Sequence, residues 1–238
     1  GYYSLKMHPD SAEKTAFSTR NDHYHFLRLP MGLHSAPTSY VMALTKLLHR
    51  ELQESALIYL DDLILFSGNF EEHLTLLKRV FDKFRSAKLR LNPEKSKFGL
   101  PEVLYLGHKF SAQGITVDES KIEVVKTFPR PSTVKSLRSF LGLINYFKRF
   151  ICSYSAISAP LRELLQKDMP FEWGERQEAA FNALKEKLCE APILSYPRVN
   201  EPFIIYTDAS KNGLGYILAQ VDAEGRERVI SYNGRATR

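Results

Sequence analysis

Three stretches of the chain carry apolar residues at helical spacing, with charged residues on the opposite face: 71–87, 132–151 and 175–191. Ser132 is the predicted N-cap of the second helix. The stripes predicted to face a core are, in chain order, Leu74, Leu77, Phe81 and Phe84; Leu137, Phe140, Leu141, Ile144 and Phe147; and Ala180, Phe181, Leu184 and Leu188.

Shorter apolar stretches bounded by turn residues predict β-strands. Residues 103–110 and 114–117 flank the turn sequence Ser-Ala-Gln-Gly and predict a hairpin. Residues 202–210, 214–221 and 227–232 are separated by turns that contain glycine, which predicts an antiparallel meander. We therefore expect an α+β fold.

Two proline-bearing stretches, 126–134 and 191–202, separate these groups of elements. Proline fixes its own φ and disfavours helix in the residue before it, so such stretches are typical of junctions. We expect the chain to divide there into three parts, 1–128, 129–195 and 196–238.

Composition narrows the class of protein. The 238 residues are 44% hydrophobic and 25% charged, which is typical of globular proteins. No apolar run approaches the roughly 18 residues of a membrane span, so we expect no membrane. Cys152 and Cys189 lie far apart and indicate neither a disulfide framework nor a zinc site, which fits a reducing compartment. The net charge of +6 suits a polyanionic partner but is weak evidence alone.

Two adjacent carboxylates, Asp61 and Asp62, interrupt the apolar sequence LIYLDDLILFS at 57–67. The flanks, 57–60 and 63–66, predict two buried strands, with the carboxylates in the tight connection between them. An ordinary Asp-Asp turn is the alternative, because aspartate accepts local backbone hydrogen bonds. Two like charges held together favour a divalent cation, and hard oxygen ligands suit Mg²⁺.

This sequence resembles the catalytic hairpin of reverse transcriptases, and its neighbours resemble gypsy-type LTR retrotransposon Pol polyproteins in the same order along the chain. The resemblance covers practically the whole chain. The matching segments are YLDDLILFS, KTAFSTRNDHYHFLRLPMGLHSAP, LNPEKSKF, LYLGHKFSAQGI, LRSFLGLINYFKRFI, FEWGERQEAAFNALKEKL and YTDASKNGLGYILAQ.

The resemblance implies a fold and an activity. Residues 1–128 would form a partial palm with a primer-grip hairpin, 129–195 thumb and connection helices, and 196–238 the first strands of a ribonuclease H-like fold. The implied function is RNA-directed DNA polymerase with associated ribonuclease H, by two-metal phosphoryl transfer. The implied partners are an RNA or DNA template, a DNA primer, dNTPs, an RNA–DNA hybrid and the remainder of the Pol polyprotein.

Roles in the polymerase site follow residue by residue from the matching motifs. Asp61 would ligate Mg²⁺, with Mn²⁺ as an alternative, and Asp62 would support the same site. Tyr2 matches the aromatic residue that excludes a ribose 2′-hydroxyl. The other residues matched to the nucleotide pocket are Pro30, Met31, Gly32 and Lys95.

Asp208 matches the first metal-binding acid of ribonuclease H. Basic residues of the predicted thumb suit phosphate contacts, although a solvated helix face is the alternative for any one of them. The candidates are Lys135, Arg138, Lys148 and Arg149.

Each matched residue also has an ordinary interpretation. Tyr2 could be a half-buried strand aromatic, Met31 a core filler, and Asp208 part of a strand-end turn. Lys95 could belong to a solvated basic face. Three departures from the family pattern leave the geometry of the nucleotide pocket open: Met31 for Phe, Val41 for Gln and Ser96 for Cys.

The family's other palm metal ligand is expected before Gly1, and further ribonuclease H acids are expected after Arg238. The sequence thus predicts an internal piece of a polyprotein, inactive alone, in an intracellular location: a cytoplasmic particle, with the nucleus as the alternative. One rival is a non-catalytic nucleic-acid-binding remnant or co-opted retroelement product. A host polymerase of the telomere-maintaining kind is a second rival, disfavoured by the ribonuclease H-like segment.

Overall fold

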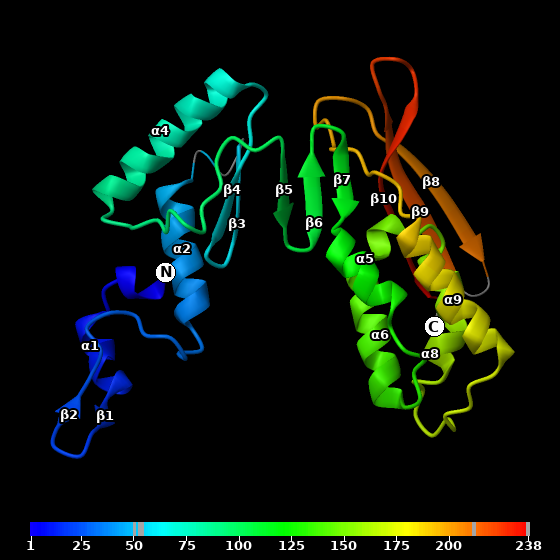
Figure 1. Cartoon of the computed structure of the whole chain (residues 1–238), viewed down its shortest axis with the longest axis horizontal. Coiled ribbons are helices and arrows are strands. Elements are labelled where there is room, and N and C mark those ends of the chain that lie inside the picture. The colour runs from blue at the N-terminus through cyan, green and yellow to red at the C-terminus, as the bar shows by residue number, and fades with distance from the viewer. Residues whose placement is uncertain (50, 52–54, 211–212, 237–238) are drawn as a thin grey trace. The chain divides into compact units, whose positions relative to one another are not determined.

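The computed structural model describes residues 1–49, 51, 55–210 and 213–236. Contacts divide the chain into two compact units, Gly1–Leu100 and Pro101–Arg238. Elements of the first unit (Figure 1) are η1 (Tyr2–Ser4), α1 (Pro9–Ala12), η2 (Glu13–Thr15), β1 (Phe17–Ser18), β2 (His23–Tyr24), α2 (Ala36–Leu47), β3 (Ala56–Tyr59), β4 (Asp62–Leu65) and α4 (Phe70–Ser86).

The core of the first unit forms where α2 and α4 meet the β3–β4 hairpin. The buried residues of this core are Tyr40, Leu44, Leu48, Leu76, Val80 and Phe84. The predicted stripe on α4 was therefore only partly right, because Leu74 is 51% exposed while Leu76 and Val80 are buried. Apolar residues cover two adjacent stripes of this helix, and packing against α2 and the β3–β4 hairpin decides which of the two is buried.

The second unit contains two antiparallel sheets and a group of helices (Figure 1). Strands β8, β9 and β10 follow one another in space as in sequence, which confirms the predicted meander. The elements are β5 (Glu102–Tyr105), β6 (His108–Ser111), β7 (Gly114–Val117), α5 (Glu119–Lys126), α6 (Val134–Tyr146), η3 (Lys148–Phe150), α7 (Tyr154–Ile157), α8 (Ala159–Glu163), α9 (Glu175–Cys189), β8 (Ile204–Ser210), β9 (Gly213–Val221) and β10 (Glu227–Ala236).

The predicted single strand 103–110 is wrong, because the chain turns at Leu106 and Gly107 and forms the β5–β6 hairpin there. Both turn residues have positive φ, 50° and 71°, a conformation that glycine adopts without strain. The Leu106 carbonyl accepts hydrogen bonds from His108 Nδ1 and from the Tyr146 hydroxyl, each at 2.8 Å. These bonds fasten the hairpin tip to α6.

Helix α6 begins one residue later than predicted. Its N-cap is Thr133, not Ser132, because the Thr133 side chain accepts from the Ser136 backbone N–H (3.1 Å) while Ser136 Oγ accepts from the Thr133 N–H (3.0 Å). The helix ends at Tyr146 and the 3₁₀ turn η3 follows, so the predicted continuous helix to residue 151 is broken at Phe147.

The proline-bearing stretch 126–134 contacts α9 and the residues just before this helix. The Phe128 carbonyl accepts from Lys185 Nζ at 3.1 Å, and the Arg130 guanidinium lies 5.5 Å from the centre of the Trp173 ring. In the second stretch, Leu194 forms a β-bridge with Ile115. Contacts divide the chain after Leu100 and not at 128, and the three-part division stays a prediction.

Candidate active site

The predicted β3–β4 hairpin is present, but its connection lies one residue earlier than the predicted Asp61–Asp62 pair, so that Asp62 is the first residue of β4. Tyr59 pairs with Asp62, so Leu60 and Asp61 form the connection between the strands. Both carboxylates are exposed. The prediction that both flanking strands are buried was wrong in part, since Leu57 and Tyr59 lie on an exposed face of the hairpin while Ile58 packs on the core.

Leu60 adopts a left-handed backbone conformation, with a φ of 56°. This conformation costs a residue with a Cβ about 1–2 kcal/mol, and it persists only where the surroundings impose it. Here Ile58, Leu63 and Leu65 pack against the core and fix both strands. The hairpin therefore stores strain at the turn that presents the acids.

Tyr40, a residue that the sequence motifs did not single out, connects Tyr2 to this turn. The rings of Tyr2 and Tyr40 meet edge to face, with centroids 5.4 Å apart and an interplanar angle of 89°. Burial raises the pKa of the Tyr40 hydroxyl, and the charges of Asp61 and Tyr2 raise this pKa further. Three distant segments of the sequence are thus brought together. The signal for Tyr40 was its helical spacing from the buried Leu44.

The matched segment before α2 is mostly at the surface. Pro30 is buried, whereas Met31 is 69% exposed, so the core-filler interpretation of Met31 is wrong. Gly32 has a φ of +92°, a conformation that favours glycine at this turn. Lys95 is exposed, and among the described residues no hydrogen bond or ion pair joins it to Asp61 or Tyr2.

Asp208 lies in the other unit, on strand β8, which forms one edge of its sheet and pairs with β9. Its side chain is exposed, and its pairing partner is Gly215. In the part of the chain that the structure describes, no cluster of three or more His, Cys, Asp or Glu residues could hold a metal ion. Asp61 and Asp62 are nevertheless the hard oxygen donors that Mg²⁺ prefers. They fit part of a metal site.

The predicted phosphate-binding residues differ in their surroundings. Lys135 and Arg138 are exposed on α6, and Lys148 is half-buried. The Arg149 guanidinium lies 5.9 Å from the Phe150 ring centre and donates to the Ile230 carbonyl at 3.5 Å. Burial lowers the pKa of Arg149. Arg149 therefore serves packing in this unit, and its phosphate-binding role stays a prediction.

Comparison with protein families identifies both ends of the chain. Residues 1–110 match the family described as Reverse transcriptase (RNA-dependent DNA polymerase). Residues 173–238 match the family described as RNase H-like domain found in reverse transcriptase. In the described residues, no helix is both long enough and apolar enough to cross a membrane.

Curated relatives extend the match over nearly the whole chain. The Pol polyproteins of Drosophila melanogaster transposons 412 and gypsy are 36% and 35% identical over 99% and 95% of this chain. The chain spans only 19% and 23% of their lengths.

Solved structures show the same fold. The foamy viral protease-reverse transcriptase in complex with double-stranded DNA has a TM-score of 0.84 at 23% identity, covering 97% of this chain and 40% of that chain. The same viral protein in complex with an RNA/DNA hybrid has a TM-score of 0.82 at 22% identity, covering 100% of this chain and 32% of that chain. Residues 1–110 therefore form a reverse transcriptase domain and residues 173–238 an RNase H-like domain, and nearly the whole chain is similar to the Pol polyproteins of gypsy-type retrotransposons.

Proposed function

We propose that this segment supplies part of an RNA-directed DNA polymerase with an associated ribonuclease H. The observation that carries the proposal is the hairpin that presents Asp61 and Asp62 to solvent. The electrostatic influence of Asp61 on Tyr40, which touches Tyr2, supports a shared site for acids and nucleotide sugar. The intact pair of acids at this turn favours an enzyme over a non-catalytic remnant.

In the proposed reaction, a primer 3′-hydroxyl attacks the α-phosphate of a dNTP and pyrophosphate leaves. Asp61 and Asp62 would hold Mg²⁺, or Mn²⁺ as the alternative, and the bound cation would supply activation of the attacking oxygen and neutralisation of charge on the leaving group. Tyr2 would contact the sugar and leave no room for a 2′-hydroxyl. The turn with Pro30, Met31 and Gly32 would border the nucleotide, and Lys95 would approach the triphosphate.

The second unit would bind the primer–template. Lys135 and Arg138 project from α6, where contacts to phosphates depend on charge and not on sequence. The solved relatives bind double-stranded DNA and an RNA/DNA hybrid, which supports nucleic acid as the partner. Asp208 would contribute one carboxylate to hydrolysis of the RNA strand. We place the protein inside the cell, in a cytoplasmic particle or the nucleus.

The test is primer extension by the longer Pol polyprotein that contains this segment, with Mg²⁺ or Mn²⁺. We expect Asp61→Asn to abolish extension, because a neutral amide is a poor ligand for a hard cation. Asp10→Asn is the matched control, since Asp10 is an exposed acid of the same unit that pairs with His8 at 3.6 Å. Binding of primer–template without extension by the unchanged protein would favour the remnant instead.

A further inference from the structure

Tyr40 occupies a position between the core of the first unit and Tyr2. It lies on α2, on the same face as Leu44 and Leu47, and is only 8% exposed. Its ring meets the Tyr2 ring edge to face. Tyr40 is therefore anchored by a helix at one end and contacts the proposed sugar-binding side chain at the other.

The hydrogen bonds around Tyr2 hold its backbone and do not involve its side chain. Tyr2 begins a three-residue 3₁₀ turn, closed by hydrogen bonds from Ser4 N–H to the Gly1 carbonyl (3.0 Å) and from Leu5 N–H to the Tyr2 carbonyl (2.9 Å). These bonds fix the main chain, whereas the orientation of the Tyr2 ring depends on its packing against the core, which includes Tyr40. An aromatic side chain keeps one rotamer only where neighbouring atoms exclude the others.

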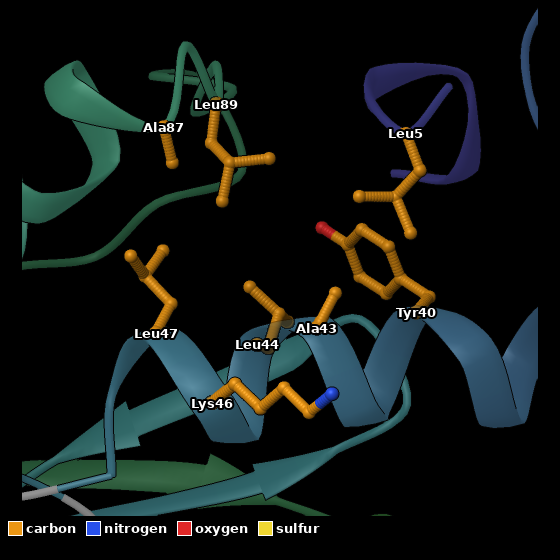
Figure 2. A pocket seen from close by; sticks show the side chains of 8 residues that line it. All are labelled: Leu5, Tyr40, Ala43, Leu44, Lys46, Leu47, Ala87 and Leu89. Carbon is orange, nitrogen blue, oxygen red and sulfur yellow. The ribbon is translucent and has the colours of Figure 1, made fainter.

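A pocket of about 340 Å³ adjoins Tyr40, with apolar side chains in most of its lining. Figure 2 shows the Tyr40 hydroxyl directed into this space, with Leu5 above the ring. The pocket leaves room for the Tyr40 hydroxyl but supports the ring through Leu5 and α2. The ring of Tyr40, and not its hydroxyl, is thus the part that contacts Tyr2 and holds it relative to α2.

We propose that Tyr40 is a positioning residue for Tyr2, whose ring it holds in the orientation that excludes ribonucleotides. This inference rests on the proposed function of Tyr2. It assigns the effect to the ring of Tyr40 and not to its hydroxyl. Loss of the ring would let the Tyr2 side chain occupy other rotamers, and the space for a 2′-hydroxyl would open. The acids at Asp61 and Asp62 would keep their positions, because β3 and β4 carry them.

The position of Tyr2 can be measured in this 238-residue chain without any catalysis. The chain is labelled with 3-fluorotyrosine, and its ¹⁹F resonance for Tyr2 is assigned by loss in Tyr2→Phe. We expect this resonance to move to the value of a free, exposed fluorotyrosine in Tyr40→Leu and to keep its native value in Tyr40→Phe. The matched control is Leu44→Ala, a core substitution one helical turn along α2, which should lower stability and leave the resonance in place.

An unchanged Tyr2 resonance in Tyr40→Leu would overturn the proposal, as would a shift of equal size in Leu44→Ala. Circular dichroism establishes that each variant is folded. If Tyr40→Leu does not fold, Tyr40→Met replaces it, with the same expected shift, because its flexible chain fills the core without presenting an aromatic edge.

The catalytic consequence is measured in the longer polyprotein as the ratio of kcat/KM for dNTP to kcat/KM for the ribonucleotide. We expect this ratio to fall about tenfold or more in Tyr40→Leu and to stay within about twofold in Tyr40→Phe and Leu44→Ala. The variant Tyr2→Ala separates the proposed role of Tyr2 from the proposed role of Tyr40. If Tyr2→Ala leaves the ratio unchanged, the proposed role of Tyr2 fails. If Tyr2→Ala lowers it and Tyr40→Leu does not, the role of Tyr40 alone is refuted.

Discussion

A buried carboxylate ties the α4 helix of the first unit to the segment before β3. The Glu51 side chain is 2% exposed and lies 2.6 Å from Lys83 Nζ and 3.3 Å from Arg79 Nη2. Both cations remain partly exposed, at 33% and 51% of their side-chain surface. Removing the carboxylate therefore leaves two cations that can turn to water, whereas removing the cations would leave an unpaired buried charge.

We predict that Glu51→Gln lowers the free energy of unfolding of the first unit by about 2 kcal/mol. A hydrogen bond to a charged group contributes roughly 1.5–3 kcal/mol, and the amide keeps the shape of the side chain but not its charge. Glu51→Ala should cost more, about 3 kcal/mol, because it also removes packing. Lys83→Met should be at least as harmful as Glu51→Gln, since the buried charge then loses its nearest partner.

The pH dependence follows from the same contacts. Burial would raise the pKa of Glu51, but the hydrogen bond from Lys83 and the charges of Lys83 and Arg79 hold its net pKa below the usual value. A lowered pKa stabilises the folded state above the unfolded-state pKa, about 4.3 for glutamate. This contribution is lost as the pH falls from there through the lower pKa of the folded state. The difference in free energy of unfolding between wild type and Glu51→Gln should become smaller as the pH falls through that range.

Hydrogen exchange separates this effect from general destabilisation. We expect the amides of α4 to exchange faster in Glu51→Gln at pH 7, and those of α9 in the other unit to keep their rates. Asp82→Asn is the control, because Asp82 forms an exposed pair with Arg85 on the same helix. Equal exchange of α4 in wild type and Glu51→Gln at neutral pH would refute the reasoning.

Two further predictions concern single residues, and a third concerns the activity of the chain alone. Gly114→Ala should destabilise the second unit by about 1–3 kcal/mol in urea unfolding followed by Trp173 fluorescence, because φ is +135° and a Cβ would meet the Leu194 carbonyl oxygen; an unchanged midpoint would contradict this. Leu60→Gly should raise stability by up to about 1 kcal/mol in thermal unfolding, since glycine adopts the left-handed turn freely, and a loss would show that the turn is unstrained. The 238-residue chain alone should extend no primer in Mg²⁺, because Asp61 and Asp62 come from a single hairpin and two-metal catalysis needs ligands from separate strands; extension that Asp61→Asn abolishes would disprove this.

The hairpin of Asp61 and Asp62 was predictable because its determinants are local, two apolar stretches of equal length on either side of two acids, but its register was off by one residue because Leu60 and not Asp62 lies in the connection. The β8–β10 meander was predictable for the same reason. The turn at Leu106 and Gly107 was missed because a Leu-Gly pair inside an apolar run carries none of the usual hairpin signals, and its stabilising donor, Tyr146, is remote in sequence.

Tertiary contacts, and not the periodicity of apolar residues in α4, determine which face of this helix is buried. A helix with apolar residues on two adjacent stripes can bury either, and the core shared with α2 and the β3–β4 hairpin includes Leu76 and Val80 instead of Leu74. Tyr40 was missed on similar grounds, since its contact with Tyr2 joins segments whose proximity only the folded chain reveals. The metal role of Asp61, the roles of Lys95 and Asp208, and the phosphate contacts of α6 remain predictions that chemistry must test.

In the first unit, the acids proposed for catalysis are different residues from those that stabilise the fold. A loss of activity can therefore be distinguished from a loss of stability. The acids sit exposed on a strained turn, while burial and ion pairing are concentrated in the α2–α4 core and at Glu51. Asp61 is exposed, so neutralising it should change the free energy of unfolding by less than about 0.5 kcal/mol. Loss of activity in Asp61→Asn would then report a lost ligand and not a lost fold. The same reasoning does not extend to Tyr40, which belongs to the core, and this is why its test depends on the control at Leu44.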